Sequence, residues 1–135
     1  MRFRQIMITI FLTIGTSVFS IAQADTVSDL LAIYTNQGAG PFSSEAGQSL
    51  LLSQGITKDG MVRSCTSCHG EQLNKKGKHI VTDKIIQPMA PSVNSERITD
   101  QKKVEKWFRR NCKWTFGREC TAQEKGDFLS FLKTQ

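Results

Sequence analysis

The run Cys65-Thr66-Ser67-Cys68-His69 contains the side chains of this chain that are best suited to chemistry. Two thiols and an imidazole at C-x-x-C-H spacing are what covalent attachment of a c-type haem requires. Each cysteine forms a thioether with a haem vinyl group, and the histidine becomes an axial ligand of the iron. A redox dithiol needs no adjacent histidine, and a zinc site needs two further ligands. The motif therefore predicts one haem c bound through Cys65 and Cys68, with His69 on the iron.

The first 24 residues are typical of a secretory signal peptide. Arg2 and Arg4 precede a largely apolar stretch, and Ala22-Gln23-Ala24 has the small residues of a cleavage site. A retained membrane anchor is the alternative, but the stretch is short for a span and contains Thr, Ser and Gly. We therefore expect residues 25–135 to form a cytochrome c domain in the periplasm, with no membrane span after cleavage.

Composition limits the possible partners. Loss of the two arginines of the leader lowers the formal net charge from +6 to +4. This mild excess of basic residues suits an acidic partner, but no basic patch with interleaved aromatic residues predicts nucleic-acid binding. A chain of this length fits one small domain, and we expect a monomer.

The elements that must position the motif are predicted to be helices. Apolar spacing and capping residues predict four of them, at 27–35, from Ser43 or Ser44 to about 53, from Asp100 to about 111, and from the capping box at Thr121 onwards. Residues 55–61 and 70–91 are expected to be irregular. This order is typical of an all-α, small class I cytochrome c-like fold, in which Gly47 would allow a close crossing with Phe128 or Phe131.

The second axial position of the iron has several candidates. Met61 is too close in the chain to the motif to reach the far side of the haem. Met89 lies between two prolines, well before the last two helices, whereas the sixth ligand of this fold usually comes just before the final helix. His79 lies among lysines and is explained at least as well as a solvated histidine.

Asn111 is a further candidate for that position. Val104, Trp107, Phe108 and Asn111 share one face of the predicted helix. An amide at the end of an apolar stripe points into the core and needs a partner there, which the haem iron would supply. Trp107 and Phe108 would then line the haem pocket. Alternatively, Asn111 simply ends its helix as a polar residue.

Cys112 and Cys120 are the two cysteines outside the motif. A leftover pair in an oxidising compartment favours a disulfide, which for a loop of this length stabilises the chain by about 2.5 kcal/mol. The bond would anchor the residue directly after Asn111. A structural staple is the commoner role for such a pair, and redox activity is a hypothesis.

Several runs together resemble the sphaeroides haem protein family of monohaem c-type cytochromes, over essentially all of the chain after residue 24. They are Met89-Ala90-Pro91-Ser92, Val104-Glu105-Lys106-Trp107, Arg110-Asn111-Cys112 and Gly117-Arg118-Glu119-Cys120-Thr121. The resemblance implies that Asn111 is the sixth ligand of the oxidised protein and leaves the iron on reduction. It also implies a Cys112–Cys120 disulfide beside the haem, a packing role for Met89, and a dihaem cytochrome c as electron donor.

The chemistry of an amide agrees with this expectation. It is a weak, hard donor, which ferric iron tolerates and ferrous iron binds poorly. We therefore expect a protein whose ferrous form binds a diatomic ligand, oxygen or nitric oxide. The alternatives are a simple electron carrier with His69 and Met89 as ligands, and a haem enzyme that metabolises oxygen, peroxide or nitric oxide; binding or electron transfer is favoured over catalysis.

Overall fold

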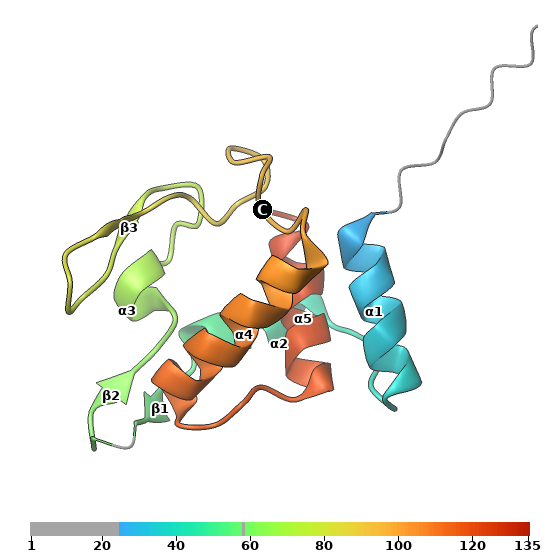
Figure 1. Ribbon diagram of the computed structural model, residues 1–135, viewed down its shortest axis with the longest axis horizontal. Helices are drawn as coiled ribbons and strands as arrows, with labels where there is room; N and C mark the ends of the chain where they lie inside the picture. The colour runs from blue at the N-terminus through green and yellow to red at the C-terminus, as the bar shows by residue number, and fades with distance from the viewer. Residues whose placement is uncertain (1–24, 58) are drawn as a thin grey trace, which may run out of the picture.

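The computed structural model describes residues 25–57 and 59–135, and the predicted signal peptide lies outside them. In this part of the chain the elements are α1 (Thr26–Asn36), α2 (Ser44–Leu52), β1 (Gly55–Ile56), β2 (Val62–Arg63), α3 (Thr66–His69), β3 (Gly77–Lys78), β4 (Ile85–Ile86), α4 (Gln101–Phe116) and α5 (Ala122–Leu132). The strands pair only as two short antiparallel hairpins, β1–β2 and β3–β4, so helices dominate the fold (Figure 1). No helix among the described residues is long and apolar enough to cross a membrane.

Side-chain caps set the start of each long helix. Ser43 accepts a hydrogen bond from the backbone N–H of Ala46 at 3.2 Å at the start of α2, as the sequence predicts. Asp25 caps α1 in the same way through the N–H of Val27. These bonds satisfy N–H groups that the first helical turn leaves without a partner.

Helix α5 is the centre of the fold, because α1 and α2 both pack against it. The predicted close crossing of Gly47 with the last helix is present. A Cβ atom on Gly47 would lie 2.2 Å from the carbonyl oxygen of Asp127 and 2.7 Å from Cβ of Phe131. Only glycine lets the backbones of α2 and α5 approach this closely.

The core consists of two clusters that α5 joins. The first packs α5 against α2 and the segment after the motif, and contains Leu51, Leu73, Ala90, Phe128, Phe131 and Leu132. The second packs α5 against α1, and contains Val27, Leu30, Tyr34 and Leu129. Cys65, Met89 and Phe108 lie at the margin of the first cluster, so the motif is connected directly to the main core.

Helix α4 is longer than the sequence pattern predicts. It begins after Asp100, whose carboxylate accepts from the N–H of Lys103 at 3.0 Å, but it continues to Phe116 instead of ending near Asn111. It ends at Gly117, which has the left-handed conformation (φ 68°) that glycine adopts without strain. Asn111 is therefore an internal helical residue, and the interpretation that it merely ends its helix is wrong.

Candidate functional site

The haem-attachment motif forms a single helical turn beside the main core. Cys65 precedes α3 and Cys68 lies within it, three positions later, so both thiols are on the same side of the turn. Both are free cysteines, Cys68 is buried, and burial raises the pKa of the Cys65 thiol to about 11. The motif thus presents two thiols that form no disulfide within the protein.

His69 carries a neutral imidazole in largely buried surroundings. Burial lowers the pKa of His69 to about 4, and the positive charge of Arg97 lowers it further. Neutral imidazole is the form that binds metals. The Nδ1 atom is buried and has no hydrogen-bond partner in the protein, which is costly for a purely structural histidine. Two free thiols beside such an imidazole fit the donor set of a haem c.

The β3 backbone packs directly onto this turn. A Cβ atom on Gly77 would lie 2.2 Å from the carbonyl oxygen of Cys68 and 2.9 Å from Cα of His69. An open groove of about 610 Å³ runs along the motif, and Lys75, Lys76 and Lys78 contribute to its lining.

The residues of α4 that the sequence assigns to the haem pocket differ in burial: one is half-buried and two are exposed. Phe108 is half-buried and contacts Phe128 edge to face, with ring centroids 5.9 Å apart. Trp107 is 46% exposed, and the guanidinium of Arg110 lies 5.1 Å from its ring centre. Asn111 is also exposed. The protein atoms therefore bring Phe108 to the core but do not cover Trp107 or Asn111.

Two other ligand candidates, Met89 and His79, make packing or turn contacts. Met89 packs at the margin of the main core, and its N–H donates to the carbonyl of Leu73 at 2.9 Å. His79 Nδ1 accepts from the N–H groups of Val81 and Thr82 at 3.2 and 3.3 Å. Its ring lies 5.4 Å from that of Trp114. These contacts give His79 a local structural role.

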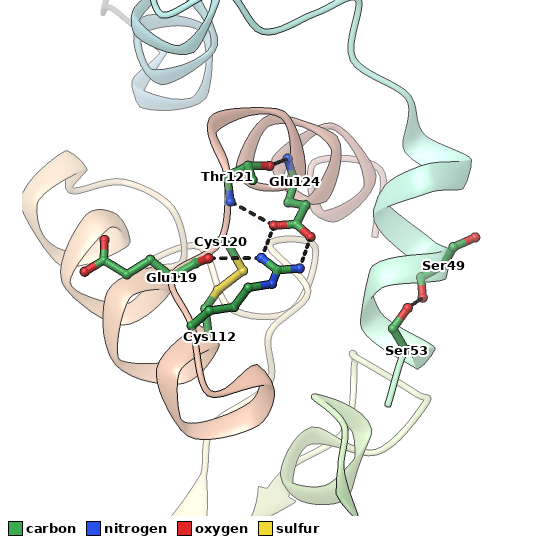
Figure 2. Close-up of polar contacts among 8 residues, drawn as sticks. Ser49, Ser53, Cys112, Glu119, Cys120, Thr121 and Glu124 are labelled. Atoms are coloured by element: carbon green, nitrogen blue, oxygen red, sulfur yellow. Dashed lines mark hydrogen bonds and ion pairs between the residues drawn. A yellow bond between two sulfur atoms is a disulfide. The ribbon is translucent and has the colours of Figure 1, made fainter. Parts of the chain in front are cut away.

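Cys112 and Cys120 lie at bonding distance and join α4 to the segment before α5, with Cα atoms 5.6 Å apart (Figure 2). The same segment is held by the predicted capping box: Thr121 and Glu124 exchange backbone-to-side-chain hydrogen bonds of 2.8 and 3.1 Å. Arg118 donates to both oxygens of Glu124, at 2.7 and 2.6 Å. The start of α5 and the residue after Asn111 are thus fixed to one another.

Two arginines near the motif, Arg63 and Arg97, make contacts that the sequence does not predict. Arg63 is 7% exposed, its guanidinium lies 4.1 Å from the ring centre of Trp114, and it donates to Asp59 at 3.1 Å. Arg97 donates to the carbonyl oxygens of Pro88 and Gln87 at 2.8 and 2.6 Å. Trp114 is distant from Arg63 in sequence and the partners of Arg97 are backbone carbonyls, so these contacts leave no pattern in the sequence.

The chain is similar to a family profile and to a characterised c-type cytochrome. A family profile described as "Domain of unknown function (DUF1924)" matches residues 37–132. The cytochrome c-type protein SHP of Cereibacter sphaeroides is 38% identical over 116 residues, which cover 86% of this chain and 89% of that protein.

Two solved structures are also similar. Oxidized SHP, described as an oxygen-binding cytochrome c, superposes with a TM-score of 0.72 at 40% identity, over 81% of this chain and 96% of that chain. The solution structure of cytochrome c″ from Methylophilus methylotrophus, which concerns haem-ligand detachment, gives a TM-score of 0.70 at 36% identity, over 81% and 93% of the two chains. The predicted all-α cytochrome c-type fold is confirmed, and the protein carries one covalent haem c.

Proposed function

Because the chain belongs to the sphaeroides haem protein family of c-type cytochromes, we propose that it is a haem protein that binds oxygen or nitric oxide once reduction has released the side chain of Asn111 from the iron. The observation that carries this proposal is the position of Asn111. Its side chain is exposed on the third turn of α4, and the helix continues for five residues beyond it. The Asn111 amide is therefore an exposed side chain whose backbone is held within helix α4.

Cys65 and Cys68 would hold the haem through thioethers, and His69 would be a ligand of its iron. The bound haem would supply an iron atom able to bind a diatomic ligand. The free thiols support the covalent attachment, and the neutral imidazole supports the ligation, because neither group must first lose another partner. Phe108 and Trp107 on α4 form the apolar wall of the site.

Asn111 acts as a replaceable cap on the iron. An amide oxygen is a weak, hard donor that suits ferric iron better than ferrous iron. The backbone around Asn111 is held by the helix and, at Cys112, by the Cys112–Cys120 disulfide. The amide therefore leaves by rotation of its own side chain. It keeps its N–H donors, which are then available to hydrogen-bond the entering ligand.

The alternative ligand set of His69 and Met89 has less support. Met89 is half-buried against the main core, and its backbone is bonded to Leu73. These contacts match the packing role that the family resemblance implies.

The electron donor is proposed to be a dihaem cytochrome c in the periplasm, reached after removal of residues 1–24. Lys75 and Lys76 are exposed beside the motif, and Lys78 forms an exposed ion pair with Asp83 at 2.7 Å. A positive surface of this kind steers an acidic partner towards the haem. The protein is proposed to act as a monomer.

Asn111→Ala tests the proposal directly. We expect the ferric holoprotein to lose the absorption spectrum of a six-coordinate, amide-ligated haem, while the ferrous form remains five-coordinate and high-spin and still binds carbon monoxide. Asn36→Ala, which removes an exposed amide from the end of α1, is the matched control and keeps the wild-type spectra. An unchanged ferric spectrum in Asn111→Ala, or a sharp low-spin α-band in the ferrous wild type, would contradict the proposal.

A further inference from the structure

Helix α4 is attached to the rest of the protein by side chains on one face. Glu105, Phe108 and Cys112 are spaced i, i+3 and i+7, so they point in nearly the same direction. Each has a partner on α5 or just before it: Lys125, Phe128 and Cys120, respectively. This face therefore determines how α4 is placed on α5.

The Glu105 carboxylate is the polar part of this attachment. Tyr34 of α1 donates its hydroxyl hydrogen to Glu105 Oε1, and Lys125 of α5 donates to Glu105 Oε2 at 2.7 Å. Tyr34 is 1% exposed, and the side chains of Lys125 and Glu105 are 16% and 37% exposed. Hydrogen bonds to a charged group are stronger than those between neutral groups. One carboxylate thus connects three helices.

The attachment points lie on both sides of Asn111. Glu105 is six positions before it, and Cys112 is one position after it. A helix held at one point can still rotate about its axis, whereas two points on one face, nearly two turns apart, fix that rotation. Asn111 is about 100° around the helix from Cys112, so its direction depends on both attachments.

We propose that Glu105, held by Tyr34 and Lys125, is a positioning residue that fixes the rotation of α4 and so presents the Asn111 amide to the iron. The inference rests on the proposed ligand role of Asn111. It assigns the Tyr34–Glu105–Lys125 cluster, which lies outside the haem motif, to control of the ligation equilibrium. The Cys112–Cys120 disulfide fixes α4 at a second point, near its C-terminal end.

Tyr34→Phe and Glu105→Gln test this role in the holoprotein. Both variants keep the size and shape of the side chain and remove the hydroxyl donor or the charge. We expect the ferric equilibrium between amide-bound and amide-free haem, measured from the absorption bands that distinguish six-coordinate from five-coordinate ferric haem, to shift at least about fivefold towards the free form. Lys133→Met is the control, because it breaks an exposed ion pair with Asp25 (3.0 Å) between α1 and α5 that does not involve α4.

A second comparison separates positioning from general destabilisation. In an Asn111→Ala background there is no amide to position, so adding Tyr34→Phe leaves the ferric spectrum unchanged. If Tyr34→Phe and Glu105→Gln lower the denaturation midpoint but leave ferric ligation as in the wild type, the positioning role is wrong and the proposed function stands. If Asn111→Ala itself leaves the ferric spectrum unchanged, both proposals are wrong.

Discussion

The contact between Gly77 and the haem motif shows how one residue without a side chain controls the site. The β3 backbone lies against the Cys68 carbonyl with no room for a methyl group. Sequence reasoning could not detect this glycine, because the contact joins segments that share no local pattern. The motif itself was accessible from the sequence, since the spacing of its two cysteines and its histidine is local.

Gly77→Ala is expected to lower the free energy of unfolding of the holoprotein by about 2 kcal/mol, in the range of overpacked cores. The added methyl must displace either β3 or the Cys68 carbonyl. The measurement is the urea midpoint, with Lys76→Ala, an exposed neighbour, as the control. Equal midpoints for the two variants would show that β3 moves away from the motif without cost.

The exposure of Trp107 and Asn111 shows what helical periodicity does not predict, namely which residues of an apolar face are buried. Spacing correctly places them near Phe108 on the helix, but it cannot say how wide the buried face is. In the structure the buried part of α4 is centred on Cys112 and Thr115. The two residues lie beside it, where contacts between helices, and not spacing, decide what covers them.

At the scale of elements, helix starts were predicted more accurately than helix ends. Ser43, Asp100 and Thr121 are local signals, and all three cap a helix. The end of α4 depended on Gly117, nine residues beyond Phe108, the last apolar position that the pattern used. Polar residues such as Asn111 continue a helix whenever the following turn packs well, so composition alone placed this boundary too early.

The capping box of α5 predicts a pH-dependent contribution to stability. The hydrogen bonds from Arg118, and then the N–H of Thr121, hold the pKa of Glu124 below its ordinary value of 4.5. The charged form is therefore favoured in the folded state. Its contribution is complete above about pH 4.5 and is lost as the pH falls through the lowered pKa. Glu124→Gln should thus cost about 1 kcal/mol at pH 7, measured by urea denaturation.

The difference between the wild type and Glu124→Gln should disappear well below pH 4.5, where the carboxyl group is protonated and resembles the amide. Glu71→Gln serves as a control for the loss of one negative charge from an exposed position. A difference that persists unchanged in acid would show that the charge of Glu124 contributes nothing to the cap.

At the scale of the whole molecule, α5 and the segment before it hold the separate parts together. Both core clusters include residues of α5, and the Cys112–Cys120 bond attaches α4 to the same region. The cytochrome c-type fold was predictable because its helix order and haem motif are both visible in the chain. The attachment of α4 through Glu105 was not, since Tyr34 and Lys125 lie far from it in sequence.

Replacement of both Cys112 and Cys120 by serine is expected to lower the free energy of unfolding by about 2.5 kcal/mol, the loop-closure contribution for this separation. Urea denaturation of the holoprotein provides the measurement. Treatment of the wild type with a reductant that leaves the thioethers intact should produce the same loss. A double variant as stable as the wild type would mean that the native fold already holds α4 without the bond.

The different states of the four cysteines have a consequence for biogenesis. Four thiols can pair in three ways, but attachment of the cofactor needs Cys65 and Cys68 as thiols while Cys112 and Cys120 are oxidised. In the proposed periplasmic location, both reactions would take place in the same oxidising compartment. Maturation must therefore proceed in an order that protects one pair from the oxidant that joins the other, and a chain that pairs its cysteines too early would never become holoprotein.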